Sequence, residues 1–281
     1  MINNYRGVSD SVLFNEVIQK LRSFFLAKGF IEVHTQDRLS ILAACEDPST
    51  VATFSYAGEV WPLPQTGQMW LEYELLTQPS LPGVFCVSTS YRAEQHPVPG
   101  RHKILFPMFE FESKGTIEDL RKIEAELLEH LGFGKKNSFP HKQYDELAAY
   151  YGVEELSHKE ENKMEHDFGK AVFLEQFPIR TSPFWNMKKN GEYANKIDVI
   201  LCGNETIGSA ERSSDKKEMK KQFETISEGG YAQKLYDLFG KARVTKELEE
   251  FLSLDFFPRF GGGIGVTRLM DAMQRNARME R

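Results

Sequence analysis

One stretch of the chain gathers the residue types that bind nucleotides, between Tyr91 and Glu112 (YRAEQHPVPGRHKILFPMFEFE). Arg92 and Glu94 are two positions apart, so on a strand they would face the same side of a sheet. A guanidinium fits phosphate oxygens, a carboxylate accepts hydrogen bonds from an exocyclic amine, and the ring of Phe106 could stack on a base. The stretch therefore predicts a nucleotide site, although a surface ion pair and a core phenylalanine would leave the same residues.

A second stretch, GGGIGVTRL at 261–269, is rich in glycine. Glycines let the backbone come close to a bulky group. A helix that follows them would offer its positive N-terminus to an anion, with Arg268 in the first turn. The pattern is neither the GxGxxG of a dinucleotide fold nor a P-loop, since no GK[ST] follows. A tight turn that packs against a sheet is the structural alternative.

A third stretch, at 197–215, carries the carboxylates Asp198 and Glu205 on either side of an expected turn. Carboxylate oxygens are the hard ligands that Mg²⁺ prefers, so this pair could hold the ion against phosphates. An exposed acid is the alternative for Glu205. Beyond the pair come small residues that would let a ligand approach, and then a cation: Gly208, Ser209 and Arg212.

Apolar periodicity and chain breakers outline the elements that must position these groups. Helices are predicted over 10–28 and 116–131, and strands over 30–35, 84–92, 105–112, 171–177 and 197–202. Residues 260–273 are predicted to pass from a glycine-rich turn into an apolar helix. The polar segment 133–167 is predicted to be a solvated helical insertion, and 215–221 an exposed helix face. Antiparallel strands with flanking helices predict one α+β domain over 1–281.

Composition excludes several classes of protein. The 281 residues hold 35 Lys and Arg against 41 Asp and Glu, a net charge of −6, which argues against a general nucleic-acid coat protein. No apolar run approaches the ~18 residues of a membrane span, and the N-terminus lacks the pattern of a secretory signal. Three scattered cysteines fit neither a disulfide scaffold nor a zinc site, so we expect a cytoplasmic protein.

Together these stretches resemble motifs 2 and 3 of class II aminoacyl-tRNA synthetases, of the asparaginyl and aspartyl type, and the small asparagine synthetases related to them. KGFIEVHTQ (28–36) resembles motif 1, and ILAACEDP (41–48) resembles the mobile loop that covers the amino acid. PLPQTGQMWLE (62–72) resembles the substrate-binding strand, and residues 167–187 are similar to the asparaginyl core. The similarity runs from about residue 10 to 275 in the family's order.

The resemblance implies antiparallel strands flanked by helices, a homodimer through motif 1, and the cofactors ATP and Mg²⁺. It implies that Arg92 binds the α-phosphate and that Arg268 covers the adenine while gripping the γ-phosphate. The remaining implied contacts are Glu94 and His102 with adenine or the outer phosphates, Phe106 stacked on adenine, Asp198 and Glu205 with Mg²⁺, Glu46 and Gln68 with the substrate amino group, and Arg212 with the substrate side chain.

Some positions depart from the family pattern. Gln36 stands at the motif 1 proline, Leu105 stands where a glutamate usually precedes the stacking phenylalanine, and Arg259 often corresponds to a histidine. The tRNA ligases of the family carry an anticodon-binding domain ahead of the core. Here the core begins almost at Met1, so we expect no such domain.

The implied activity is adenylation of an aspartate- or asparagine-like amino acid, which turns a poor electrophile into one with a good leaving group. The expected absence of an anticodon reader favours a stand-alone amide-forming ligase that resembles asparagine synthetase and passes the acyl group to ammonia or another amine. The alternatives are aminoacyl transfer to tRNA and a catalytically silent paralogue that binds ATP or an amino acid. An argument against the silent paralogue is the presence of Arg92, Glu94, Phe106, Glu205 and Arg268.

Overall fold

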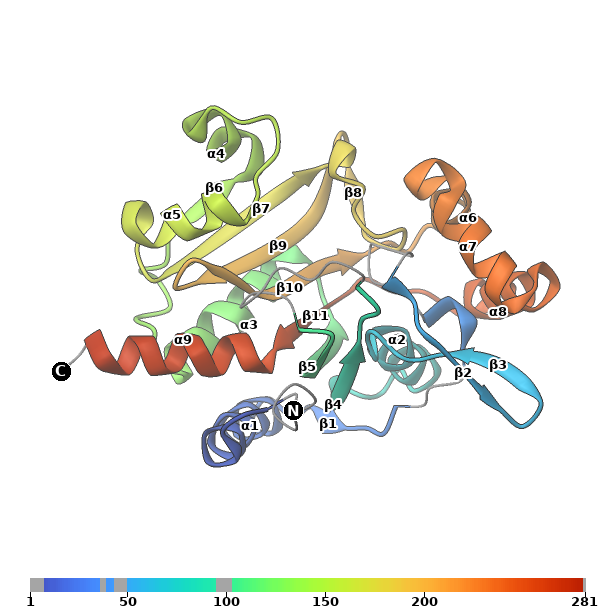
Figure 1. Cartoon of the computed structure of the whole chain (residues 1–281), viewed down its shortest axis with the longest axis horizontal. Helices are drawn as coiled ribbons and strands as arrows, with labels where there is room; N and C mark the ends of the chain where they lie inside the picture. The colour runs from blue at the N-terminus through green and yellow to red at the C-terminus, as the bar shows by residue number, and fades with distance from the viewer. Residues whose placement is uncertain (1–7, 36–38, 43–49, 95–102, 280–281) are drawn as a thin grey trace.

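A computed structural model describes residues 8–35, 39–42, 50–94 and 103–279, and within these ranges a nine-stranded sheet forms the centre (Figure 1). The strand order is β1-β4-β5-β11-β10-β9-β7-β6, and β8 pairs with β9. Neighbouring strands are antiparallel except for β1–β4 and β6–β7. The predicted α+β class is therefore confirmed. The strands of this sheet are β1 (Ile31–Glu32), β4 (Gly83–Tyr91), β5 (Leu105–Lys114), β6 (His141–Gln143), β7 (Ala171–Pro178), β8 (Lys189–Asn190), β9 (Tyr193–Leu201), β10 (Asn204–Arg212) and β11 (Arg259–Gly265).

The strands predicted at 84–92 and 105–112 are confirmed as the antiparallel pair β4–β5, with Ser90 opposite Phe106. The strand predicted at 30–35 is much shorter, because only β1 pairs with the sheet, parallel to β4. A separate hairpin, β2 (Thr53–Tyr56) with β3 (Glu59–Pro62), projects from the body of the molecule.

Three helices share one apolar cluster with the sheet: α1 (Ser11–Ala27), α3 (Ile117–His130) and α9 (Val266–Met279). The side chain of Asp10 caps α1 by accepting from the backbone N–H groups of Val12 and Leu13, each at 3.0 Å. Gly29 ends this helix at a positive φ of 82°, a conformation that favours glycine. The helices predicted over 10–28 and 116–131 are confirmed.

A second apolar cluster joins α2 (Gln68–Thr77) to three consecutive helices near the C-terminal part of the chain, α6 (Lys216–Thr225), α7 (Gly230–Phe239) and α8 (Lys241–Ser253). Helix α6 buries Met219 and Phe223 while its lysines stay at the surface. The exposed helix face predicted at 215–221 is confirmed. Short 3₁₀ turns complete the chain: η2 (Ser40–Leu42), η4 (Ile179–Thr181) and η5 (Ile226–Gly229).

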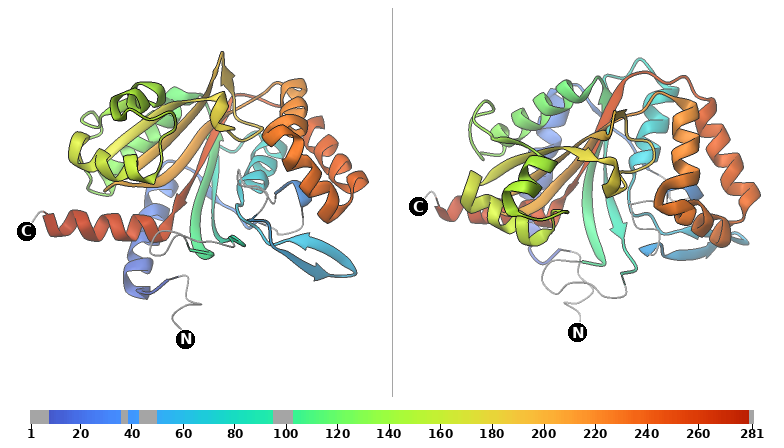
Figure 2. Two further views of the ribbon diagram at one scale, coloured as in Figure 1. Left: turned by 45° about the horizontal axis from the view of Figure 1, so that its top comes forward. Right: turned by 90° about the horizontal axis from the view of Figure 1, so that it is seen from above.

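The predicted solvated insertion at 133–167 is wrong in its burial. Besides β6, it forms α4 (Tyr144–Tyr151) and α5 (His158–Phe168), which lie at the opposite end of the sheet from α6–α8 (Figure 2). Leu147 of α4 and Met164 of α5 are buried against Leu174 of β7 in a third apolar cluster. The few apolar side chains of the segment therefore form a small core with β7, and its polar residues cover that core.

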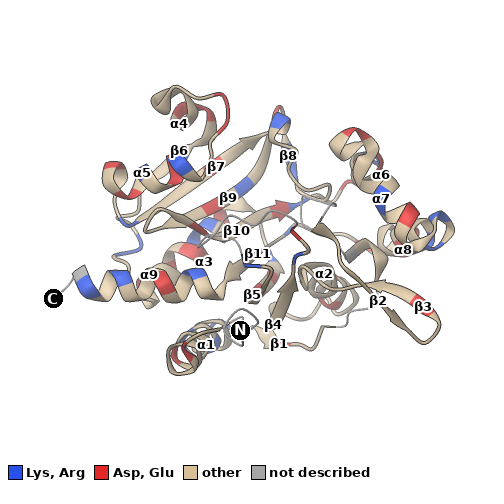
Figure 3. Cartoon of the chain, in the orientation of Figure 1, with Lys and Arg blue, Asp and Glu red and all other residues tan. Residues whose placement is uncertain are grey.

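Charge is mixed along the chain rather than gathered in one block, although basic residues recur along α9 (Figure 3). Of the helices that the structure describes, none combines the length and apolarity needed to cross a membrane.

Candidate active site

The floor of the candidate site consists of residues that alternate along neighbouring strands. Gly208 of β10 pairs with Asp198 of β9 and with Gly263 of β11. Gly263 in turn pairs with Glu110 of β5. Paired residues on neighbouring strands project to the same face of a sheet. Because its two central residues have no side chain, other groups can come close to the backbone of this row: the side chain of Met108 at Gly263 and carboxylate oxygens at Gly208.

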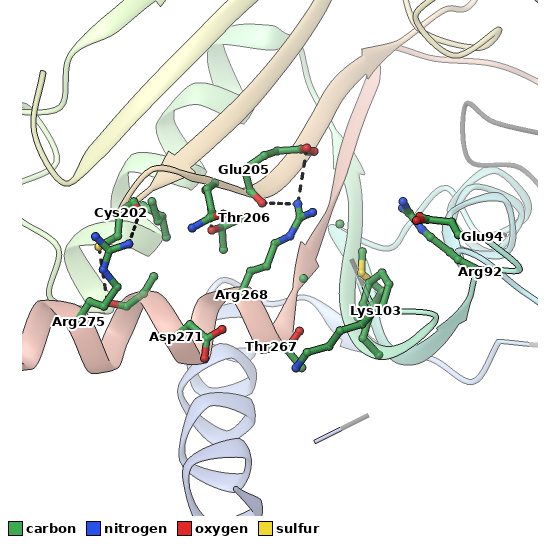
Figure 4. Close-up of a pocket in the computed structure, with 18 residues that line it drawn as sticks. Arg92, Glu94, Lys103, Cys202, Glu205, Thr206, Thr267, Arg268, Asp271 and Arg275 are labelled. Carbon is green, nitrogen blue, oxygen red and sulfur yellow. Dashed lines mark hydrogen bonds and ion pairs between the residues drawn. The ribbon is translucent and has the colours of Figure 1, made fainter. Parts of the chain in front are cut away.

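A cavity of about 260 Å³ opens at this floor (Figure 4). Arg92 and Arg268 line it from different parts of the chain, and so share one cleft. The other predicted site residues that line it are Glu94, Phe106, Glu205 and Gly208.

Arg92 and Glu94 reach the cavity from a loop, not from a strand. Strand β4 ends at Tyr91, so the predicted strand geometry of this pair is wrong. The backbone N–H of Arg92 donates to the carbonyl of Ile104 at 2.9 Å, which fixes its position at the start of β5. Its guanidinium carbon lies 5.5 Å from the centre of the Phe106 ring. The buried Nε of Arg92 donates to no residue that the structure describes, which leaves it free for a phosphate oxygen.

Arg268 approaches the cavity from α9. The predicted glycine-rich turn before this helix is wrong, because Gly261, Gly263 and Gly265 all lie in β11, which passes directly into α9. The position of Arg268 in the first turn is confirmed. Its Nη1 donates to the carbonyl of Glu205 at 2.6 Å and lies 3.7 Å from the carboxylate of that residue. The positive end of the helix adds to the attraction for an anion here.

Asp198 and Glu205 form an oxygen cradle around Gly208. If residue 208 had a Cβ, that atom would lie 3.3 Å from Oε1 of Glu205 and 3.6 Å from Oδ1 of Asp198. The Nζ of Lys196 lies 3.2 Å from the other oxygen of Asp198. In the described ranges no three acidic, histidine or cysteine side chains are grouped to hold a metal. Two hard carboxylate oxygens would fit Mg²⁺ as part of its oxygen shell.

Gln68 lies at the N-terminus of a helix, where a substrate-binding strand was predicted. It is the first residue of α2, so the predicted strand at this position is wrong. The carboxylate of Glu110 holds the preceding turn, since it accepts from the Gly67 N–H at 2.7 Å and from the hydroxyl groups of Thr66 and Ser88. The side-chain amide of Gln68 donates to Glu72 at 3.0 Å.

Arg212 is fully buried in a network of carboxylates and guanidinium groups. Its Nε and Nη2 donate to the two oxygens of Glu112 at 3.0 and 3.1 Å. Arg259 also pairs with Glu72, but its Nε and Nη2 both donate to the same oxygen, Oε2, at 3.0 and 2.6 Å. The amide of Asn186 also donates to Glu72, at 2.6 Å. The Nε of Arg212 also lies 3.9 Å from Oε1 of Glu72. Arg212 and Gln68 therefore belong to one polar network, which lies outside the lining of the cavity.

Burial shifts the acid groups of this network toward protonation. It raises the pKa of Glu112 to about 7, while the guanidinium group of Arg212 acts in the opposite direction. Burial also raises the pKa of Glu110, against the hydrogen bonds from Ser88, Thr66 and the Gly67 N–H. The ionised state of Glu112 therefore depends on its pairing with Arg212.

Sequence reasoning missed the carboxylates that position the predicted residues: Glu72, Glu110 and Glu112. Their signal was present in the strand sequence FEFE, where two acids alternate with phenylalanine and so face the same side. Acids on the inward face of an apolar strand need a partner, and the chain supplies it from distant segments.

The structure places the other residues named in the sequence analysis in three different ways. Gly208 forms the cavity floor as described. The hydroxyl of Ser209 donates to the carbonyl of Ile197 at 3.1 Å and lies beside Glu124 of α3, on the opposite face of β10 from the cavity. Glu46 and His102 lie outside the described residues, as does Gln36.

The chain is similar to known aminoacyl-tRNA ligases over most of its length. The aspartate–tRNA(Asp) ligase of Pyrobaculum aerophilum is 25% identical over 92% of this chain and 62% of its own length. The asparagine–tRNA ligase of Symbiobacterium thermophilum is 25% identical over 95% of this chain and 66% of its own length. Of the solved structures, the crystal structure of asparaginyl-tRNA synthetase from Pyrococcus horikoshii complexed with asparaginyl-adenylate has a TM-score of 0.74. It is 22% identical and is matched over 93% of this chain and 64% of its own.

The chain thus spans somewhat less than two thirds of the length of the relatives that it matches. The structural match shows that the fold is shared, with the sheet and helices described above. The sequence model of the tRNA synthetases class II (D, K and N) matches residues 10–280, almost the whole chain. The chain belongs to this class II tRNA synthetase family.

Proposed function

We propose that the cavity binds ATP and that the chain activates an aspartate- or asparagine-like amino acid as its adenylate. The observation that supports this most directly is that Arg92 and Arg268 line one cavity over a floor of glycines. Two cations and an aromatic ring that line one cavity suit a purine nucleotide, whose base is flat and whose phosphates are anionic.

In the proposed reaction a carboxylate oxygen of the amino acid attacks the α-phosphorus of ATP. A new P–O bond forms, the bond from the α-phosphorus to the bridging oxygen breaks, and pyrophosphate leaves with that electron pair. Negative charge grows on the phosphorus oxygens, and Arg92 would stabilise it through its unpartnered N–H. Mg²⁺ held by Asp198 and Glu205 would supply further positive charge to the phosphates.

The amino-acid side chain would be recognised by the buried network beyond the cavity. Arg212 uses two donors for Glu112, and both bonds come from Nε and Nη2. Within the described residues Nη1 makes no such bond, so this edge could donate to an oxygen of a carboxylate or amide side chain. Gln68 would orient the amino group, in a position fixed by Glu72 and by the turn that Glu110 holds.

For the acceptor, the relatives favour tRNA. The curated proteins named above are aminoacyl-tRNA ligases for aspartate and asparagine, which supports aminoacyl transfer to tRNA. They give no support to ammonia or another small amine, the acceptor that the sequence analysis favoured. We therefore place the tRNA ligase ahead of the stand-alone amide ligase.

The test is amino-acid-dependent exchange of radiolabelled pyrophosphate into ATP, measured in the presence of Mg²⁺ across the twenty standard amino acids. Aspartate or asparagine should support exchange, and the others should not. The active amino acid would then be offered with bulk tRNA or with ammonia, and charging of tRNA is expected. ATP binding without exchange for any amino acid would contradict the proposal and identify a silent paralogue. Amide formation without tRNA charging would overturn the choice of acceptor.

A further inference from the structure

Each of the two carboxylates that would hold Mg²⁺ is paired with a basic side chain. The Nη1 of Arg268 lies 3.7 Å from the carboxylate of Glu205, and Figure 4 marks this contact with a dashed line. The Nζ of Lys196 lies 3.2 Å from Oδ2 of Asp198. Lys196 has no part in the proposed reaction, yet a positive charge beside a metal ligand opposes the binding of a metal cation.

The two ion pairs differ in burial, and therefore in how easily they separate. The side chains of Arg268 and Glu205 are 34% and 38% exposed, so a phosphate can compete with Glu205 for Arg268. The side chains of Lys196 and Asp198 are only 12% and 9% exposed. The ammonium group of Lys196 also lies 4.1 Å from the centre of the Phe177 ring. Because separation of this pair would leave a buried charge without its partner, we expect Lys196 to stay with Asp198.

Asp198 lies between two cavities. Its Oδ1 lies 3.6 Å from the position of a Cβ at Gly208, on the floor of the cavity described above. Asp198 also lines a second cavity of about 410 Å³ together with Lys196, which is two positions away on β9 and so faces the same side of the sheet. Arg180, which lines this second cavity too, pairs instead with Asp145. A nucleotide in the first cavity therefore need not displace Lys196 from Asp198.

A third carboxylate adds to the negative charge near this pair. Glu161 of α5 lines the second cavity with Asp198 and accepts from the backbone N–H of Glu205 at 3.2 Å. Without Lys196, three carboxylates would stand against the positive charge of Arg268, and such an excess of acidic oxygens suits a free divalent cation. With Lys196 in place, two positive charges offset most of this excess.

We propose that Lys196 is a positioning residue that acts through Asp198: it offsets the charge of this carboxylate, so that the site binds a divalent cation tightly only when a nucleotide is present. The identity of the nucleotide as ATP rests on the proposed function. A nucleotide brings negative charge, and its phosphates compete with Glu205 for Arg268. Both effects shift the balance of charge toward binding of the cation.

Binding of Mn²⁺ in the absence of nucleotide tests this role. Mn²⁺ suits the same carboxylate ligands as Mg²⁺, and electron paramagnetic resonance measures its free concentration. Lys196→Gln and Lys196→Met both remove the charge, and each should raise the affinity for Mn²⁺ about tenfold. Lys196→Arg keeps the charge and should bind Mn²⁺ as the wild type does. Lys246→Met, which removes a lysine paired with Glu250 on α8, is the matched control.

The same titration with ATP tests the dependence on nucleotide. Wild type should bind Mn²⁺ at least about tenfold more tightly with ATP than without it, and the gain from either charge-removing variant should then shrink to about threefold or less. Relaxation of water protons distinguishes Mn²⁺ on the chain from Mn²⁺ on free ATP. Thermal melting shows which variants fold, and one folded charge-removing variant is enough for the comparison.

The outcomes separate this inference from the proposed function. Unchanged or weaker Mn²⁺ binding after removal of the charge would overturn the role of Lys196 even if pyrophosphate exchange is active, and so would tighter binding in Lys196→Arg. Equal affinity of the wild type for Mn²⁺ with and without ATP would overturn the dependence on nucleotide. Tighter binding in the charge-removing variants alone supports the inference even if no amino acid supports exchange, in which case the proposed function fails alone.

Discussion

Glu112 and Arg212 form a buried bidentate ion pair, and the pair depends on glycine at position 261. Glu112 of β5 lies opposite Gly261 of β11, and its carboxylate fills the space in which a Cβ at residue 261 would lie. The carboxylate then reaches across β11 to the guanidinium of Arg212 on β10. Because Gly261 of β11 has no side chain, Glu112 of β5 and Arg212 of β10 can form an ion pair across the strand between them.

Gly261→Ala should disrupt this arrangement. The added methyl group would overlap the Glu112 carboxylate and the carbonyl of Phe111, so the carboxylate would have to move away from Arg212. We expect the free energy of unfolding to fall by about 3 kcal/mol, because a buried charge would lose its partner. Urea denaturation measures this. Gly230→Ala is the control, since a Cβ there would meet no atom within 4 Å and the residue has helical φ and ψ. Equal stability of the two variants would show that the sheet can adapt without breaking the pair.

Arg92→Ala should abolish most pyrophosphate exchange while the fold is kept. Arg92 is in a loop, and its guanidinium contacts Phe106 but forms no buried ion pair with a described residue, so its loss should cost little stability. The proposed charge contact with the transition state would be lost, which corresponds to about 10²-fold in rate. Exchange rates and thermal melting curves measure the two quantities separately. Arg278→Ala, exposed near the end of α9, should change neither. Full activity of Arg92→Ala would remove this residue from the proposed mechanism.

Glu205→Gln should weaken the dependence of ATP binding on Mg²⁺. The carboxylate lies beside Gly208 with that of Asp198, and an amide supplies a poorer, uncharged ligand to a hard cation. We expect the Mg²⁺ concentration for half-maximal ATP binding to rise about tenfold, with little change in ATP binding when Mg²⁺ is removed by chelation. Titration of Mg²⁺ at fixed ATP measures this. Glu224→Gln, exposed on α6, is the control. If the variant loses affinity for ATP equally with and without Mg²⁺, Glu205 acts on the nucleotide directly.

The parts of the fold that local patterns determine could be predicted from the sequence. Helix α1 has a capping aspartate, an apolar stripe and a terminal glycine within one stretch, so its bounds follow from nearby residues. The pair β4–β5 likewise follows from two apolar runs on either side of a loop. The convergence of Arg92, Phe106 and Arg268 was predicted because ordered motifs resemble a known family, and the cavity confirms it.

The errors arose where distant segments decide the local structure. Glycines usually indicate a turn, but Gly261 and Gly263 lie in a central strand because the neighbouring strand fills the space with Glu112 and Met108. Gln68 begins a helix because Glu110, more than 40 positions away, holds the preceding turn. The polar segment 133–167 was predicted to be solvated because few of its residues are apolar, yet those few meet β7. Such pairings depend on strand order, which residue spacing alone does not encode.

Glu124→Gln should change how stability depends on pH. Glu124 of α3 is fully buried, with the hydroxyl of Ser209 beside its carboxylate. Burial raises the pKa of Glu124 from its ordinary 4.5 to about 8 against the lowering effect of Ser209, and the nearby charges of Glu175 and Asp198 raise it further. The folded chain therefore keeps a proton on Glu124 at neutral pH that the unfolded chain has already released.

The sign of the effect follows from this difference in bound protons. Between pH 4.5 and 8 the unfolded state binds fewer protons than the folded state at this group, so each rise in pH favours unfolding. The contribution of Glu124 to the free energy of unfolding is fully present below pH 4.5 and is lost as the pH rises toward 8, with a limiting slope of about 1.4 kcal/mol per pH unit.

Glutamine cannot ionise, so the Glu124→Gln variant lacks this slope. Relative to wild type, its free energy of unfolding should rise by about 1 kcal/mol for each pH unit from 5 to 8. Urea denaturation at several pH values measures the difference, and Glu16→Gln, exposed on α1, should show none. If the free energies of unfolding of variant and wild type differ by a constant amount across this range, Glu124 is ionised in the folded protein and the prediction is wrong.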